Sequence, residues 1–183
     1  MTLDQDEQLL YEAFANYASD SLFWSLIFLN NAVFGTPFLE DSRNKLMSLS
    51  QMYETIMLSV YPVGQCSGLI ETMKRRSGCF AHYVDCLLAG SPETGAALEQ
   101  WRQNGQSIAL MLSELNPYWK PAEWSALVSH EAELMETIAV NMKDKNYAAF
   151  VSTAPVCRRL AMDMSKYMCS GILRQRKEAG NQG

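Results

Sequence analysis

The sequence predicts an all-α protein: a single-domain bundle of six helices that run up and down. Apolar residues recur at intervals of three and four almost throughout, which is the period of an amphipathic helix, and no stretch alternates with the period of two that marks a strand. Glycine and proline gather at a few short joints, and short joints make consecutive helices antiparallel neighbours. A chain of 183 residues has the size of one domain.

The joints divide the chain into its predicted elements. They lie at 35–37, 61–64, 90–92, 116–117 and, more weakly, 145–146. The helices between them are expected at 20–34, 38–60, 67–89, 93–114, 121–143 and 147–175. We expect residues 1–18 to form a partly helical N-terminal segment, residues 19–177 the bundle domain, and residues 178–183 a disordered tail.

The first predicted helix is apolar on all sides from Leu22 to Leu29. Such a helix either occupies the centre of a bundle or is half exposed at a subunit interface. Both interpretations stay open. A position at a subunit interface predicts a homodimer with a two-fold interface that buries more than about 1,000 Å².

The second, fourth and last helices each carry one apolar face. On the fourth, Gly105 lies in the middle of the face formed by Trp101 and Ile108. A glycine there costs about 1 kcal/mol in helix propensity, so we expect a neighbouring helix or a bulky ring to approach it closely. On the last helix the seam runs from small residues to methionines, which fits plain core and, as an alternative, a groove for an apolar ligand.

Two charges interrupt the apolar faces of the third and fifth helices. Arg76 lies between Met73 and Phe80, and Glu131 lies one heptad after Trp124. An unpaired buried ion costs several kcal/mol, so each charge needs a partner or the mouth of a cavity. We expect Arg76 and Glu131 to pair between the two helices. The alternative is that Arg76 binds a ligand in an internal pocket.

Histidines and sequence motifs give little support for catalysis. His82 lies opposite the apolar face of its helix and is expected to face solvent without a role. His130 lies at the margin of its apolar face, either as a half-buried hydrogen-bonding residue or as part of a candidate ligand pocket with Arg76 and Glu131. The sequence contains no Glu-x-x-His pair, phosphate-binding glycine loop or nucleophile elbow. We therefore expect no catalytic residues, no metal and no cofactor.

The most distinctive segment reads Asn-Pro-Tyr-Trp-Lys-Pro-Ala-Glu-Trp, at residues 116–124. Its prolines end one helix and begin the next, and Pro121 is expected in the first turn of the following helix, where a missing N–H is no loss. Three aromatic side chains lie at this joint, and we expect both tryptophans to be buried. The segment predicts a packed structural elbow formed by Asn116, Pro117, Tyr118, Trp119 and Trp124.

From Leu115 to Gln175 the chain resembles a family of small helical bacterial proteins. The shared features are Asn-Pro-Tyr-Trp, a second tryptophan, a histidine on the next helix, and a methionine before Gly-Ile. In this sequence they are Asn116, Pro117, Tyr118, Trp119, Trp124, His130, Met164, Gly171 and Ile172. Some members carry the name acetylglutamate kinase, which does not fit a helical chain, because amino-acid kinases are α/β proteins with glycine-rich loops.

The resemblance also implies an internal polar or metal site in the family. Members commonly have a histidine on the first helix and a Glu-His pair on the third. The corresponding places here hold Leu26 and Arg75–Arg76, and Lys166 replaces an aspartate near the end. The resemblance therefore implies that this chain has lost such a site, has a salt bridge in its place and has kept the bundle.

Composition narrows the classes of function. The net charge of −5 and the pI of about 5.1 give no electrostatic basis for nucleic-acid binding. The acidic start is unlike a signal peptide, and no apolar stretch reaches the ~20 residues of a membrane span. Five cysteines without a C-x-x-C spacing indicate reduced, mostly buried thiols and a cytoplasmic location. We expect a non-catalytic binding or scaffolding module, acting as a homodimer, with a small-molecule- or metal-binding bundle as the alternative.

Overall fold

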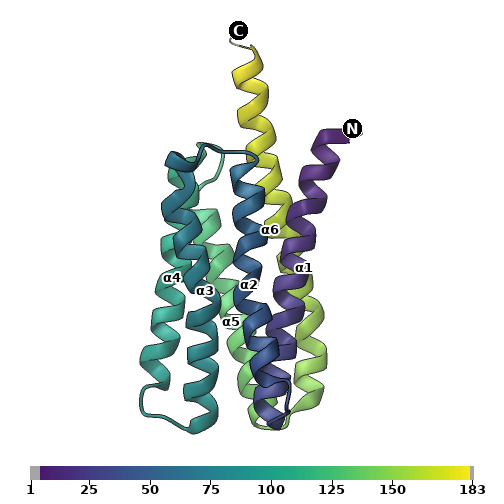
Figure 1. Ribbon diagram of the computed structural model, residues 1–183, viewed down its shortest axis with the longest axis vertical. Coiled ribbons are helices and arrows are strands. Elements are labelled where there is room, and N and C mark those ends of the chain that lie inside the picture. Colours follow the sequence, from purple (N-terminus) through teal and green to yellow (C-terminus); the bar gives the residue numbers. More distant parts are fainter. Residues whose placement is uncertain (1–4, 182–183) are drawn as a thin grey trace.

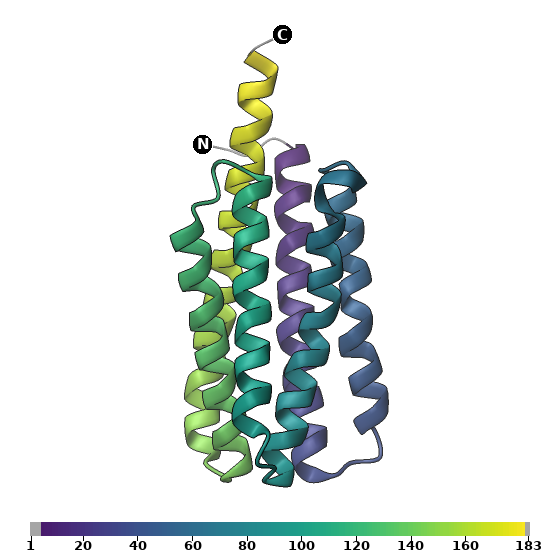
Figure 2. The ribbon, with the colours of Figure 1, turned by 90° about the vertical axis from the view of Figure 1, so that its left-hand side faces the viewer.

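The computed structural model describes residues 5–181, and within this range the chain forms helices and no strand. This confirms the predicted all-α bundle. The helices are α1 (Gln5–Phe34), α2 (Leu39–Leu58), α3 (Val63–Ala89), α4 (Thr94–Leu115), α5 (Pro121–Lys143) and α6 (Tyr147–Asn181). They lie nearly parallel to the long axis of the molecule, and the last turns of α6 project beyond the other helices (Figures 1 and 2).

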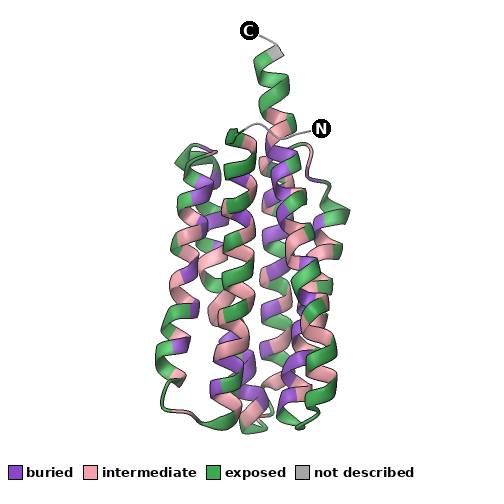
Figure 3. Cartoon of the chain, turned by 90° about the vertical axis from the view of Figure 1, so that its right-hand side faces the viewer, coloured by how far each residue is buried: buried purple, intermediate pink, exposed green. Residues whose placement is uncertain are grey.

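The helices form a closed ring. Each one packs mainly against the next in the chain, and α6 packs against α1. Across the interior, α1, α3 and α5 also contact one another. Buried residues line the inward faces of the helices, whereas the projecting end of α6 is exposed (Figure 3). None of the described helices combines the length and the apolar character needed to cross a bilayer.

The first helix is longer than the predicted 20–34. It begins at Gln5 because Leu10 and Phe14 are buried on the same side as the later core residues. The charged first turn hides this continuation in the sequence. The last helix continues to Asn181, so residues 178–181, expected to belong to a tail, are helical, and residues 182–183 lie outside the described range.

The apolar surface of α1 is only partly buried, because α1 is one member of the ring of helices. Phe28 and Leu29 are fully buried, Leu22 faces the interior cavity described below, and α1 contacts four other helices. Leu22, Trp24, Leu26 and Ile27 are half-buried, and 54% of the surface of Phe23 is exposed. The homodimer through this helix stays a prediction.

The core consists of two apolar clusters stacked along the bundle. The cluster nearer the elbow includes Phe14, Trp119 and Trp124, and the cluster at the other end includes Phe28 and Trp101. All five cysteines are free thiols, and four of them are buried in these clusters. The expectation of mostly buried thiols is therefore confirmed.

The elbow between α4 and α5 is held by a buried asparagine. Asn116 is fully buried, and its side-chain amide donates hydrogen bonds to Tyr61 Oη at 2.8 Å and Gln175 Oε1 at 3.0 Å. Its side-chain oxygen accepts a hydrogen bond from the backbone N–H of Tyr118 at 2.9 Å. Pro121 begins α5, as predicted. The elbow is thus tied to the joint between α2 and α3 and to α6 as well as to its own helices.

Both elbow tryptophans are buried, each with 1% of its surface exposed. Their rings meet edge to face, with centroids 6.2 Å apart, and Trp124 also packs on Tyr167 of α6. The indole N–H of Trp119 donates to the carbonyl oxygen of Met168 at 3.2 Å. This contact is close because Gly171 has no side chain: an added Cβ would lie 2.0 Å from Trp119 Nε1.

We predict that Gly171→Ala destabilises the protein by about 1–3 kcal/mol, the usual cost of overpacking a close-packed core. The added methyl group must displace the Trp119 indole and break its hydrogen bond to Met168. Urea unfolding checks this, with Gly180→Ala as the control, because an added Cβ there meets no atom within 4 Å. Equal stabilities of the two variants would contradict the prediction.

Candidate functional site

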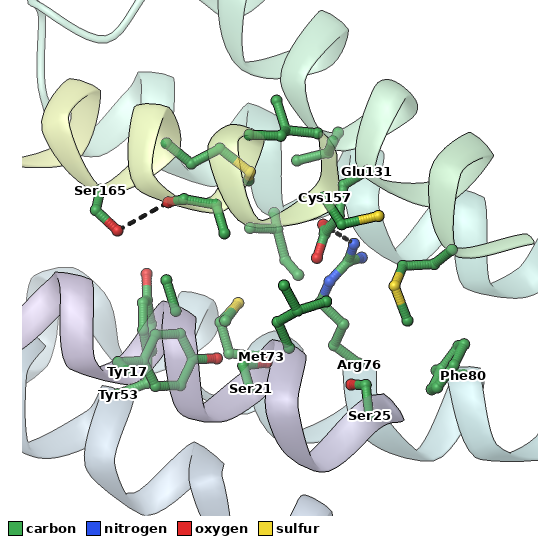
Figure 4. Close-up of a pocket in the computed structure, with 18 of the residues that line it drawn as sticks. Tyr17, Ser21, Ser25, Tyr53, Met73, Arg76, Phe80, Glu131, Cys157 and Ser165 are labelled. Carbon is green, nitrogen blue, oxygen red and sulfur yellow. Dashed lines mark hydrogen bonds and ion pairs between the residues drawn. The ribbon is translucent and has the colours of Figure 1, made fainter. Parts of the chain in front are cut away.

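A cavity of about 140 Å³ interrupts the core where the two apolar clusters meet. Residues from all six helices line it. Most are apolar, but polar side chains from several helices also line the space (Figure 4). Those labelled in the figure are Tyr17, Ser21, Ser25, Tyr53, Arg76, Glu131 and Ser165.

An ion pair forms part of the cavity wall. Arg76 Nη2 donates to Glu131 Oε2, so the expected pairing of α3 with α5 is present. The side chain of Arg76 is 14% exposed and that of Glu131 is 35% exposed. The carboxylate therefore retains access to water, whereas the guanidinium depends mainly on its protein partner.

The guanidinium of Arg76 occupies space left by a glycine. An added Cβ at Gly105 would lie 2.9 Å from Arg76 Nη1, and Arg76 Cζ lies 5.6 Å from the centre of the Trp101 ring. The close approach predicted at Gly105 is present, although the group that approaches is a charged side chain. Stacking over an indole face stabilises a desolvated cation by about 2 kcal/mol.

Two tyrosines lie together at the other side of the cavity (Figure 4). The ring centroids of Tyr17 and Tyr53 are 5.2 Å apart. Burial raises the pKa of Tyr53 well above its ordinary value. Burial, and then the negative charge of Glu131, also raises the pKa of Tyr17. Both phenols therefore stay protonated and remain hydrogen-bond donors across the physiological pH range.

A buried thiol also lines the cavity. Cys157 is 6% exposed, and burial, followed by the charge of Glu131, raises the pKa of its thiol to about 11. A neutral, buried thiol of this kind is unreactive. The cavity therefore contains no activated nucleophile at this position.

Several donors at the cavity have no partner. Within residues 5–181, four buried side-chain polar atoms make no hydrogen bond, and three of them belong to residues that line this cavity. The three are Tyr53 Oη, Trp101 Nε1 and Trp124 Nε1. Such groups normally find a partner, because leaving one unsatisfied costs about 1–3 kcal/mol.

The candidate pocket of Arg76, His130 and Glu131 needs one correction. Arg76 and Glu131 line the cavity, but His130 is exposed on α5 and does not. Its place at the margin of the apolar face turns it outward. His82 is exposed, as expected.

Sequence reasoning missed the tyrosines and serines of the site. Tyr17, Ser21 and Ser25 follow one another at intervals of four on α1. That spacing places three polar groups on one face of a helix that otherwise looked uniformly apolar. Together with Arg76 and Glu131, these three polar residues on one face of α1 could have predicted a polar site inside the bundle.

Comparison of the chain with protein-family models, with curated proteins and with solved structures finds no match. The resemblance to the helical family with the Asn-Pro-Tyr-Trp elbow therefore remains a proposal.

Proposed function

We propose that this protein is a non-catalytic binding protein that holds a small molecule in its central cavity. The proposal rests on one observation: three buried donors without partners, Tyr53 Oη, Trp101 Nε1 and Trp124 Nε1, belong to residues that line one cavity. A ligand that accepts hydrogen bonds would satisfy groups that the chain itself leaves unpaired.

The size and lining of the cavity favour a small, largely apolar molecule. Its volume of about 140 Å³ is close to that of an engineered apolar cavity of about 150 Å³ that binds benzene in another protein. Aromatic rings and methionines form much of the wall, and methionine adapts its shape to different ligands.

The polar groups favour an acceptor on the ligand. Tyrosine, tryptophan and arginine offer N–H and O–H donors, while the carboxylate of Glu131 is already engaged by Arg76. A carbonyl oxygen on an apolar ring fits this pattern. The five free cysteines favour a reducing location such as the cytoplasm.

A matched pair of probes tests the proposal. Acetophenone and α-methylstyrene have nearly the same shape, but only acetophenone has a carbonyl oxygen. We predict that acetophenone binds about 2- to 10-fold more tightly, which corresponds to one net hydrogen bond of about 0.5–1.5 kcal/mol. Binding is measured from the indole N–H signals of Trp101 and Trp124 in NMR titrations.

Two variants locate the binding. Ala161 lines the cavity, so Ala161→Leu should fill it and abolish binding of both probes. Ala148 is exposed on the same helix, and Ala148→Leu should leave binding unchanged. Tyr53→Phe should reduce the preference for acetophenone if its phenol is the donor. Absence of acetophenone binding to the native protein would contradict the proposal. Unchanged binding in Ala161→Leu would mean that the probe binds outside this cavity and would also contradict it.

A further inference from the structure

A second group of polar side chains lies at the turn between α3 and α4, at the end of the bundle opposite the elbow (Figure 1). It consists of His82, Cys86 and Glu93. One ring nitrogen, the thiol sulfur and one carboxylate oxygen all lie within 4.8 Å of one another. This group shares no residue with the central cavity.

We propose that His82, Cys86 and Glu93 bind a divalent metal ion of the zinc class. Imidazole, thiolate and carboxylate are the three ligand types that zinc takes in proteins. A soft sulfur beside a nitrogen and an oxygen disfavours magnesium and calcium, which prefer oxygen ligands alone. Three protein ligands leave a fourth position for water.

The distance between the thiol and the imidazole is close to that which a tetrahedral metal needs. Zinc bonds of about 2.3 Å to sulfur and about 2.0 Å to nitrogen place the two ligand atoms about 3.5 Å apart. Cys86 Sγ lies 3.8 Å from His82 Nδ1 and 3.9 Å from Nε2. The Glu93 oxygen lies within 4.8 Å of the other two ligand atoms, so metal binding requires His82 and Glu93, both exposed side chains, to rotate toward the sulfur.

The local fold fixes the ligands relative to one another. His82 and Cys86 are four residues apart on α3, so they lie on the same face of the helix. Gly90 ends α3 in the left-handed conformation, with φ of 63°. The carbonyl oxygen of Cys86 then accepts hydrogen bonds from Ser91 N at 2.9 Å and Thr94 Oγ1 at 3.0 Å. The turn that carries Glu93 is therefore anchored to the residue that supplies the thiol.

The neighbouring carboxylate does not belong to this group. Asp85 precedes Cys86, but Arg43 of α2 holds both of its oxygens, at 2.9 and 2.8 Å. Asp85 is therefore already neutralised. Glu93 is the carboxylate that lies with the imidazole and the thiol.

Cobalt(II) provides the direct test, because a cobalt–thiolate bond gives a charge-transfer band that nitrogen and oxygen ligands alone do not. The reduced full-length protein is titrated with Co²⁺, and Zn²⁺ is then added. We expect one Co²⁺ per chain, a thiolate band, and loss of that band as Zn²⁺ displaces Co²⁺. Cys86→Ala should remove the band, and His82→Ala and Glu93→Gln should each weaken binding about tenfold or more.

Matched controls separate this site from adventitious binding. His130 on α5 is another exposed histidine. Cys79 is a half-buried thiol on α3, the helix that also carries His82 and Cys86. Neither His130→Ala nor Cys79→Ala should change the band. His82 and Glu93 are exposed, so their variants remain informative if Cys86→Ala does not fold. If the native protein gives no thiolate band, the group is a Cys–His contact without a metal site. If the band survives in both His82→Ala and Glu93→Gln, the thiol binds cobalt without help from the histidine or the carboxylate. Either result overturns the proposal.

Discussion

Trp124→Ala is expected to destabilise the protein by about 3–5 kcal/mol, the usual cost of removing a large aromatic side chain from a core. Trp124 is 1% exposed and packs on both Trp119 and Tyr167, so its removal leaves a void where the elbow meets α6. For a chain of this length each kcal/mol lowers the melting temperature by about 2–4 °C. Calorimetry and urea unfolding measure both quantities.

Trp24→Ala is the matched control for this result. Trp24 is half-buried on α1, and its ring contacts Phe23, which is itself largely exposed, and the ammonium group of Lys45 at 5.9 Å. Removing the same number of atoms should therefore cost clearly less there. A loss of less than about 1 kcal/mol in Trp124→Ala would mean that the elbow collapses around the missing ring and is not a rigid joint.

The fold was predictable because its signals are local. Helical periodicity and the joints at Gly35, Gly90 and Pro117 define helices within a few residues of their observed ends. The exceptions were the start of α1 and the end of α6, which continues to Asn181 where the prediction ended at 175. Leu10 and Phe14 are spaced as one face of a helix, but the polar residues around them looked like a separate segment. Their burial depends on α6 and the α2–α3 region, which only the tertiary structure brings together.

The candidate site was predictable only in part. Arg76 and Glu131 stood out because a charge on an apolar stripe needs a partner, and that physical requirement holds in any fold. Tyr53 and Trp101 gave no such signal, because an amphipathic aromatic residue on a core stripe normally finds its hydrogen bond. The only sequence feature that marks His82 and Cys86 as a possible pair is their spacing of four residues, which places both on one face of a helix. Glu93 becomes their neighbour through the turn at Gly90, which sequence spacing alone does not reveal.

The Arg76–Glu131 pair should show strong energetic coupling. We expect Glu131→Met to cost about 2–4 kcal/mol, because it strands a guanidinium that is only 14% exposed. Arg76→Met should cost less, since the Glu131 carboxylate, at 35% exposed, can turn toward water. Methionine is unbranched and fills irregular space, so the double variant should cost less than the sum, with a coupling energy of about 1–3 kcal/mol.

The exposed pair Lys166–Asp163 is the control for this double-mutant cycle. Its atoms are 3.2 Å apart, but both side chains are 63% exposed, so its coupling should be below about 1 kcal/mol. If Arg76 and Glu131 couple no more strongly than this surface pair, Glu131 is not what stabilises the guanidinium. The charge of Arg76 would then be free for an anionic group, and a carboxylate-bearing probe such as benzoate should bind the cavity more tightly than acetophenone. If Arg76 and Glu131 couple strongly, acetophenone should bind more tightly than benzoate. An anion in the cavity would then have to compete with Glu131 for the guanidinium of Arg76.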